Sequence, residues 1–138
     1  MPTIEPSAEH LQQFLAEKSD DSAIVMINLL RYRDRAQYPP GAAARPCSGR
    51  DAYRRYAAAV TPMIAELGAK VLWSGSVQRT LIGPEDEAWD DALLVEYPSR
   101  KAFFKMICEA SYLEAAEHRT AALADSRLIA TVSPAGLF

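Results

Sequence analysis

Residues 23–33 read AIVMINLLRYR and form the most concentrated apolar run of the chain. The apolar residues do not alternate with polar ones, which is typical of a strand that is buried on both faces. Isoleucine and valine fit such a strand well. The run therefore predicts a central β-strand on which the other elements pack. It contains a single amide, Asn28, and closes with two arginines.

Three further strands are predicted around this one. Residues 92–97 are mostly apolar, which indicates a second central strand. Residues 70–82 alternate, so that Val71, Trp73 and Gly75 share one face, and their half-polar faces indicate a sheet edge. A strand glycine often marks a bulge, which we expect at Gly75. Residues 126–132 are predicted to form the last strand.

A long helix is predicted between the first two strands. Ser48 and Asp51 form a capping box at its start. Apolar residues then recur with helical spacing as far as Leu67, and Gly68 supplies the stop. This spacing predicts one buried helix face.

Two shorter helical regions are predicted at the ends of the chain. Ser7 can cap a helix through about Lys18. Ser99 can cap another, which we expect to break near residues 109–111 and to continue over residues 112–121.

The order of the elements predicts the fold. Without the N-terminal helix, the order is strand, helix, strand, strand, helix, strand, as in the ferredoxin-like fold. Right-handed crossovers place the first and third strands in the centre. We therefore expect an α+β, ferredoxin-like βαββαβ domain with a four-stranded antiparallel sheet. A chain of 138 residues forms one such domain, with a helical extension over residues 1–22 and a long loop over residues 34–49.

The predicted sheet has apolar residues on both faces, but its helices cover only one. An exposed apolar face of this size usually contacts a partner. We expect a homodimer in which two open sheet faces pack together, which gives a dimeric α/β barrel.

Composition limits the other partners and cofactors. The net charge of −3 argues against a nucleic-acid partner, and no apolar run approaches the roughly 20 residues of a membrane span. Two isolated cysteines and two distant histidines predict no metal site. No phosphate-binding loop or other cofactor motif is present, so no cofactor is predicted. The first residues lack a signal segment, which predicts a cytoplasmic location.

The chain resembles the bacterial family called domain of unknown function 1330, in the dimeric α/β-barrel superfamily, from about residue 24 to residue 129. The resemblance implies the dimeric ferredoxin-like fold and no established reaction. It rests on the order and spacing of short pieces: Asn28-Leu29-Leu30-Arg31, Tyr53-x-x-Tyr56, Val60-x-Pro62, Trp73-Ser74-Gly75, Trp89-Asp90, Val95 to Arg100, Phe103 with Met106, and Tyr112 through His118-Arg119 to Asp125-Ser126.

Asn28 is the first candidate site residue. An amide in a buried strand costs on the order of 1–3 kcal/mol unless it is hydrogen-bonded. It either faces a cavity and orients a ligand, or makes a structural hydrogen bond. The sequence leaves both interpretations open.

His118 is the candidate catalytic residue, because an imidazole can act as a general base near neutral pH. No carboxylate or nucleophile is spaced to form a relay with it. A structural histidine that hydrogen-bonds to another element is the favoured interpretation.

Arg31, Tyr56 and Trp73 are, with Asn28, the candidate substrate-binding residues. Small-molecule pockets are mostly apolar with a few convergent polar groups, and the aromatic residues that could line one are Tyr53, Tyr56, Trp73, Trp89 and Tyr97. Strand alternation places Arg31 opposite Asn28, so the two share a site only if the strand bends or bulges near Leu29.

Glu96 needs a cation if it is buried, and Arg31 or Arg119 are the candidates.

Together, these features predict a small cytoplasmic homodimer. It would bind or transform a small organic molecule, neutral or anionic, in a pocket between sheet and helices. The alternative is a non-catalytic ligand-binding or structural dimer. The sequence decides neither whether the protein is an enzyme nor which molecule it binds, haem included.

Overall fold

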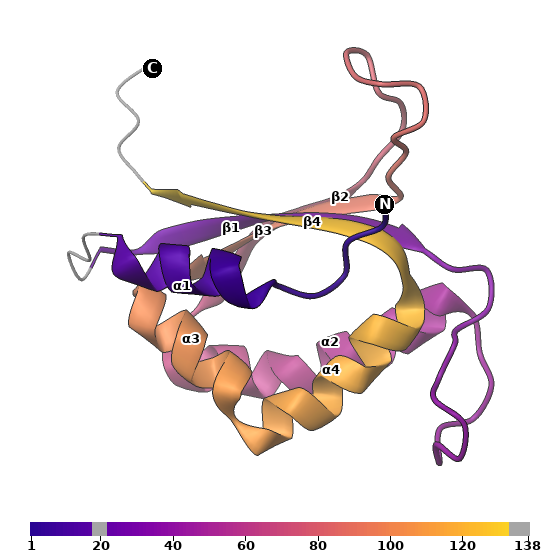
Figure 1. Ribbon diagram of the computed structural model, residues 1–138, viewed down its shortest axis with the longest axis horizontal. Coiled ribbons are helices and arrows are strands. Elements are labelled where there is room, and N and C mark those ends of the chain that lie inside the picture. The colour runs from indigo at the N-terminus through magenta and orange to yellow at the C-terminus, as the bar shows by residue number, and fades with distance from the viewer. Residues whose placement is uncertain (18–21, 133–138) are drawn as a thin grey trace.

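The computed structural model describes residues 1–17 and 22–132. Four antiparallel strands form one sheet in the order β2-β3-β1-β4, and the helices lie on one side of it (Figure 1). This is the predicted α+β, ferredoxin-like arrangement. The elements are α1 (Ala8–Ala16), β1 (Ile24–Tyr32), α2 (Gly49–Leu67), β2 (Lys70–Ser76), β3 (Asp91–Tyr97), α3 (Arg100–Cys108), α4 (Ala110–Ala122) and β4 (Leu123–Val132).

The strand β1 lies in the centre, as predicted, paired with β3 on one side and β4 on the other. Its side chains alternate between the two faces of the sheet. Ile24, Met26, Asn28 and Leu30 are buried toward the helices, while the residues between them are partly exposed on the open face. β1 therefore carries apolar residues to both faces of the sheet.

The strand β2 ends earlier than predicted, at Ser76 rather than Ile82. Its neighbour β3 is only seven residues long, so the ladder gives residues 77–82 no pairing partner. Residues 77–90 instead form a loop that rises from the sheet on the side opposite the helices (Figure 1).

A register shift in β2 lies between Val71 and Trp73, and not at Gly75 as predicted. Val71 pairs with Val95, whose side chain faces the helices, whereas Trp73 pairs with Leu94, which faces the open side. The two residues therefore lie on opposite faces of the sheet. Gly75 has another role: a Cβ atom there would lie 2.6 Å from the Trp73 ring.

Gly49 joins three elements where β1, α2 and α4 meet. Its N–H donates to the Arg33 carbonyl at 3.1 Å, and the Arg33 N–H donates to the Ala122 carbonyl at 2.8 Å. A Cβ atom on Gly49 would lie 2.1 Å from the Arg33 oxygen, which is shorter than any van der Waals contact. Only glycine fits at this position.

The helices begin and end close to their predicted positions. Ser48 caps α2 by accepting the Asp51 N–H at 3.0 Å, and Ser99 caps α3 in the same way. The predicted break between α3 and α4 lies at Glu109. α4 passes directly into β4, which begins three residues earlier than predicted.

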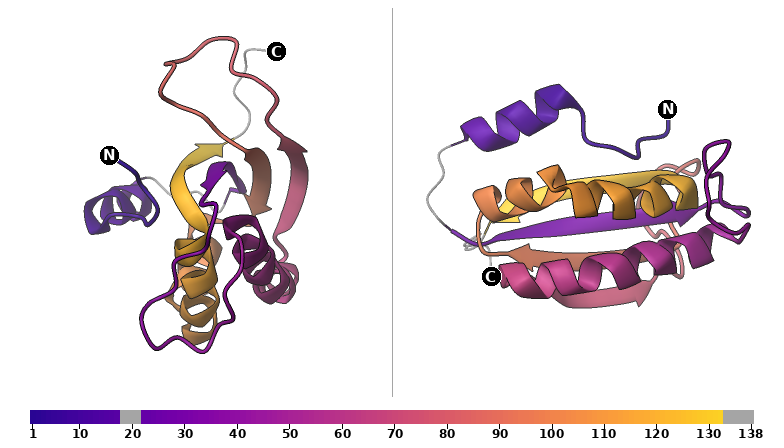
Figure 2. Two further views of the ribbon diagram at one scale, coloured as in Figure 1. Left: turned by 90° about the vertical axis from the view of Figure 1, so that its right-hand side faces the viewer. Right: turned by 90° about the horizontal axis from the view of Figure 1, so that it is seen from below.

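The helix α1 lies beside the β4 edge, outside the layer formed by the other helices (Figure 2). None of its residues is buried. Phe14 packs edge-on against Phe103 with ring centroids 5.9 Å apart, and Glu17 pairs with Arg100 at 3.2 Å. The helix ends at Ala16, with Glu17 as its C-cap, which is about two residues before the predicted end near Lys18.

The long loop after β1 is anchored to α4 along its length. Gln37 N–H donates to the Ala121 carbonyl at 2.9 Å, and the Tyr38 hydroxyl lies 2.6 Å from Nδ1 of His118. Arg55 Nη1 contacts both the Tyr38 hydroxyl and the Arg45 carbonyl. The loop is irregular, as predicted, but several hydrogen bonds hold it in place.

Replacing Gly49 by alanine tests the junction. The added methyl group must displace backbone, and we expect the variant to lose about 2–3 kcal/mol of unfolding free energy in urea denaturation. Gly83→Ala is the control, since the Cβ atom there approaches only a Thr80 methyl group in an exposed loop. A Gly49→Ala protein as stable as the control would contradict the conclusion that only glycine fits at position 49.

Candidate functional site

A cavity of about 1140 Å³ lies between the helix-facing side of the sheet and the helices. The floor comes from β1 and β3, the walls from α2, α3 and α4, and residues 3–11 close one side. Most of its lining is apolar, with Val60, Ile64, Val95 and Phe103 among the residues that form it. This volume is slightly above the usual range of small-molecule pockets, about 300–1,000 Å³.

Asn28 lines this cavity from the middle of β1. Its side chain is on the buried face because even-numbered residues of β1 face the helices. One amide hydrogen donates to the Met26 carbonyl over 3.3 Å, and only 9% of the residue is exposed. Among the described residues, the rest of the amide has no hydrogen-bond partner, so it is free to bond to a molecule in the cavity.

Four tyrosines surround the same space. Tyr53 and Tyr56 lie on the inner face of α2, with ring centroids 5.3 Å apart. The Tyr56 hydroxyl is 3.1 Å from that of Tyr112 on α4. Tyr97, at the end of β3, completes the group. The hydroxyls of Tyr53 and Tyr97 have no hydrogen-bond partner in the part of the chain that the structure describes.

Tyr53, Tyr56 and Tyr97 remain protonated at neutral pH. Burial raises the pKa of Tyr53 to about 12, and the nearby Arg119 charge opposes part of that rise. Burial, reinforced by the neighbouring Tyr112, also raises the pKa values of Tyr56 and Tyr97. The hydroxyl groups therefore act as hydrogen-bond donors or acceptors in the cavity, and not as phenolate bases.

Arg119 reaches the cavity from α4, and sequence reasoning did not include it in the site. Its guanidinium donates to the carbonyl oxygen of Ile4 in the N-terminal segment. The sequence offered Arg119 as a partner for Glu96, but Glu96 pairs with Lys70 at 3.8 Å. Arg119 lies where α4 meets the N-terminal segment at the cavity wall, and no local sequence pattern signals a contact across more than a hundred residues.

Asn28 and Tyr56 are the predicted site residues that the structure brings together. Arg31 and Trp73 lie on the open face of the sheet, away from the cavity. The register of β1 is continuous from Ile24 to Leu30 against both neighbours, so no bulge near Leu29 turns Arg31 inward. Trp73 is carried to the open face by the register shift in β2.

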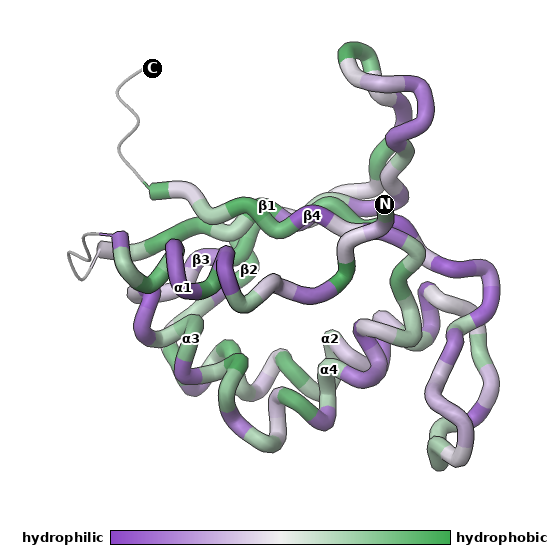
Figure 3. The backbone as a smooth tube through the Cα atoms, in the orientation of Figure 1, coloured by the Kyte–Doolittle hydropathy of each residue, from purple (hydrophilic) through white to green (hydrophobic). Residues whose placement is uncertain are grey.

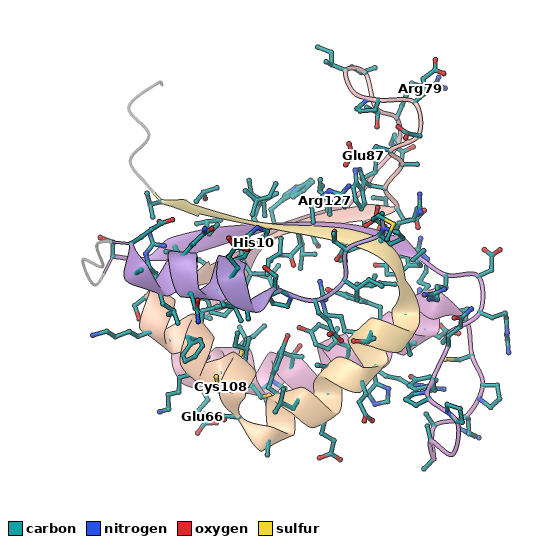
Figure 4. All side chains as sticks on the ribbon, viewed as in Figure 1. His10, Glu66, Arg79, Glu87, Cys108 and Arg127 are labelled. Carbon is teal, nitrogen blue, oxygen red and sulfur yellow. The ribbon has the colours of Figure 1, made fainter. Side chains whose placement is uncertain are left out.

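His118 does not line the cavity. It points toward the long loop, where its ring packs edge-on against Tyr38 with centroids 5.5 Å apart. The imidazole that does reach the cavity is that of His10, which lies on α1 at the exposed rim (Figure 4). The geometry of His118 is therefore that of a residue which secures the loop.

A second, smaller cavity of about 430 Å³ lies between the start of α2 and the end of β2. Three of its polar side chains, those of Tyr32, Arg50 and Asp91, already contact one another. Asp91 accepts hydrogen bonds from the Tyr32 hydroxyl at 2.7 Å and from Arg50 at 3.0 Å. It is a weaker candidate for a binding site, because a ligand would have to break these contacts.

Within residues 1–17 and 22–132, no three His, Cys, Asp or Glu side chains are grouped so as to hold a metal ion. No helix in this part of the chain is long and apolar enough to cross a membrane.

Raised tyrosine pKa values make stability depend on alkaline pH. Tyrosine ionises near pH 10 in the unfolded chain, but Tyr53 stays neutral in the folded protein to about pH 12. Its contribution is therefore complete below pH 10 and is lost as the pH rises toward 12.

We expect Tyr53→Phe to reduce the alkaline loss of unfolding free energy by about 1 kcal/mol between pH 9 and 11. Urea denaturation at several pH values measures this difference. Identical pH profiles for the variant and the wild type would show that Tyr53 is not buried as described.

Two comparisons relate this architecture to known proteins. The family model described as domain of unknown function 1330 (DUF1330) matches residues 46–132. No curated protein matches the chain.

Several solved structures are similar to the chain. The protein RPA0582 of Rhodopseudomonas palustris, described as being of unknown function, is 41% identical over 97% of this chain and 98% of its own, with a TM-score of 0.89. A dimeric protein of unknown function from Bacteroides fragilis, described as having a ferredoxin-like fold, is 12% identical, with 80% of this chain and 96% of its own covered and a TM-score of 0.50. Hydroxynitrile lyase from Passiflora edulis is 9% identical, with 86% and 99% covered and a TM-score of 0.53. The last two likenesses concern the fold alone, and one fold serves many functions.

Proposed function

The chain belongs to the DUF1330 family, and we propose that it is a homodimeric protein that binds a small organic molecule in the cavity between its sheet and its helices. The family is described only as a domain of unknown function, so the proposal depends on the site itself.

Unpartnered polar groups in an apolar cavity are the observation that carries the proposal. The Asn28 amide and the hydroxyls of Tyr53 and Tyr97 line this space. Each has a hydrogen-bond donor or acceptor that has no partner among the described residues. These atoms reach the cavity surface, so a ligand with matching groups could hydrogen-bond to them and would fill the apolar volume at the same time.

Binding suits the cavity better than covalent catalysis by its side chains. Neither Cys47 nor Cys108 lines it, and burial keeps Tyr53 and Tyr56 neutral by raising their pKa values. The His118 imidazole, predicted as a general base, lies outside it. The noncatalytic interpretation is therefore the one we adopt.

A cytoplasmic location is part of the proposal. Cys47 and Cys108 are both free thiols, as is usual in a reducing compartment.

Asn28 and Ser126 allow a matched test of the binding site, because both are buried polar residues on neighbouring strands. Ser126 also lines the cavity, but its hydroxyl already donates to the Thr3 carbonyl at 2.7 Å. Replacing it by alanine removes that bond and should cost about 1 kcal/mol. Asn28→Leu keeps the volume and removes the unpartnered groups together with one long hydrogen bond, to the Met26 carbonyl at 3.3 Å, so its unfolding free energy should change by less than about 0.5 kcal/mol.

The two variants should differ in whether a ligand raises their thermal stability. In a thermal-shift screen of metabolites, a compound that stabilises the wild type should also stabilise Ser126→Ala but not Asn28→Leu. If Asn28→Leu is strongly destabilised and its ligand response is unchanged, Asn28 has a structural role and the proposal is wrong.

The homodimer forms, we propose, through the open face of the sheet. A continuous apolar row crosses all four strands there, since Trp73 pairs with Leu94, Leu94 with Ile27, and Ile27 with Ile129. Trp73 is 55% exposed and Ile129 is 48% exposed in a single chain. Two such faces packed about 10 Å apart would bury this row.

The loop of residues 77–90 supports the same partner. It projects beyond the open face and carries an apolar tip (Figure 3), where Leu81 and Ile82 are almost fully exposed. At its base, Glu87 pairs with Arg127 of β4 at 3.1 Å, and both are seen there in Figure 4. A second copy placed against the sheet would lie beside this loop. The Bacteroides fragilis protein with the same fold is described as dimeric.

A charge on the open face should prevent the dimer. We expect the wild type to sediment as a dimer at micromolar concentration, and Ile129→Lys, on the edge strand β4, to sediment as a folded monomer. Leu113→Lys is the control, since Leu113 is an equally exposed leucine on the helical side. A wild-type monomer, or an Ile129→Lys dimer, would count against the proposed interface.

A further inference from the structure

The structure assigns a chemical class to the ligand: we propose that the cavity binds an organic carboxylate with an apolar body, and that Arg119 receives the carboxylate. This inference rests on the proposed function, because it names the ligand of the same cavity.

Within residues 1–17 and 22–132, Arg119 forms no ion pair, because each ion pair in this part of the chain uses another basic residue. Among the same residues, its guanidinium forms one hydrogen bond, to the uncharged carbonyl of Ile4. A guanidinium carries five N–H donors in a planar fork, so this contact leaves most of them free.

Arg119 shares the cavity lining with three neutral hydroxyl groups. Its positive charge lowers the pKa values of Tyr53, Tyr56 and Tyr97 against the larger effect of burial, and all three tyrosines line the same cavity. The carboxylates at the cavity, Glu5 and Glu117, lie on its exposed rim, and Glu5 accepts a hydrogen bond from Thr120 at 3.1 Å. The half-buried Arg119 guanidinium thus lines a mostly apolar space, and no carboxylate of the described residues pairs with it there.

A carboxylate fits these donors. It can take two parallel N–H bonds from the guanidinium, and charge-assisted bonds of this kind are about twice as strong as neutral ones. The Ile4 carbonyl already shows that an oxygen acceptor can approach Arg119 from the cavity side. The free hydroxyls of Tyr53 and Tyr97 can supply further donors.

The remaining lining of the cavity favours an apolar group in the part of the ligand beyond its carboxylate. Val60, Ile64, Val95 and Phe103 provide an apolar surface that a hydrocarbon or an aromatic ring can cover. A phosphate is a poorer candidate, because its two charges would meet a single, half-buried cation. Arg127, which also reaches the cavity, is paired with Asp125 at 2.9 Å and with Glu87.

Calorimetry on the full chain tests this assignment with named probes. Phenylacetate, 3-phenylpropionate and octanoate should bind to the wild type, whereas the matching amides and inorganic phosphate should bind at least 10-fold more weakly. Binding of the carboxylates should also weaken as the salt concentration rises.

Arg119→Gln separates a role in binding from a role in packing. Glutamine keeps an N–H donor for Ile4 but carries no charge, so carboxylate affinity should fall at least 10-fold and the preference for carboxylates over amides should disappear. Arg119→Lys should restore part of that preference. Arg54→Gln is the control, since Arg54 is an exposed residue of α2 outside the main cavity.

Three outcomes would overturn the assignment: no carboxylate binds at millimolar concentration, the amides bind as well as the acids, or Arg119→Gln keeps the wild-type preference. The metabolite screen with Asn28→Leu decides separately whether the cavity binds any molecule, so the two proposals can fail independently.

Discussion

The alternation of side chains along β1 is the constraint on which the rest of the structure depends. β1 is paired on both sides, so its register is fixed and cannot slip without exchanging its two faces. Even-numbered residues build the floor of the cavity, and odd-numbered residues build the open apolar face. One strand thus supplies both surfaces to which we assign a function, a ligand site on one side and a dimer interface on the other.

The same constraint explains how much of the fold could be predicted. The order of the elements and the two apolar central strands can be read directly from the sequence. Together they predicted the order of the strands in the sheet and the sheet face that no helix covers. The end of β2 could not be predicted, because residues 77–82 alternate like a strand but lack a partner in β3. No sequence pattern indicated the register shift after Val71, which places Trp73 on the open face of the sheet, away from the cavity.

The candidate site was predicted in part. Asn28 and Tyr56 lie where strand and helix periodicity place them. Predicting Arg119 as a site residue would have required knowledge of a contact between α4 and the N-terminal segment. Tertiary packing sets this contact, and the local spacing of residues does not indicate it. His118 was predicted as a site residue because its imidazole could act as a general base. Its imidazole contacts the Tyr38 hydroxyl outside the cavity instead.

Asn28 permits the most direct measurement of the central claim, because it is the only asparagine in the chain. Selective ¹⁵N labelling of asparagine side chains therefore gives a single pair of amide signals in an NMR spectrum. If the cavity is a ligand site, these signals will shift during titration with a compound that stabilises the protein, and the shift will saturate at the affinity found by calorimetry. If such a compound binds and the Asn28 signals stay in place, the ligand lies elsewhere and this account of the cavity is wrong.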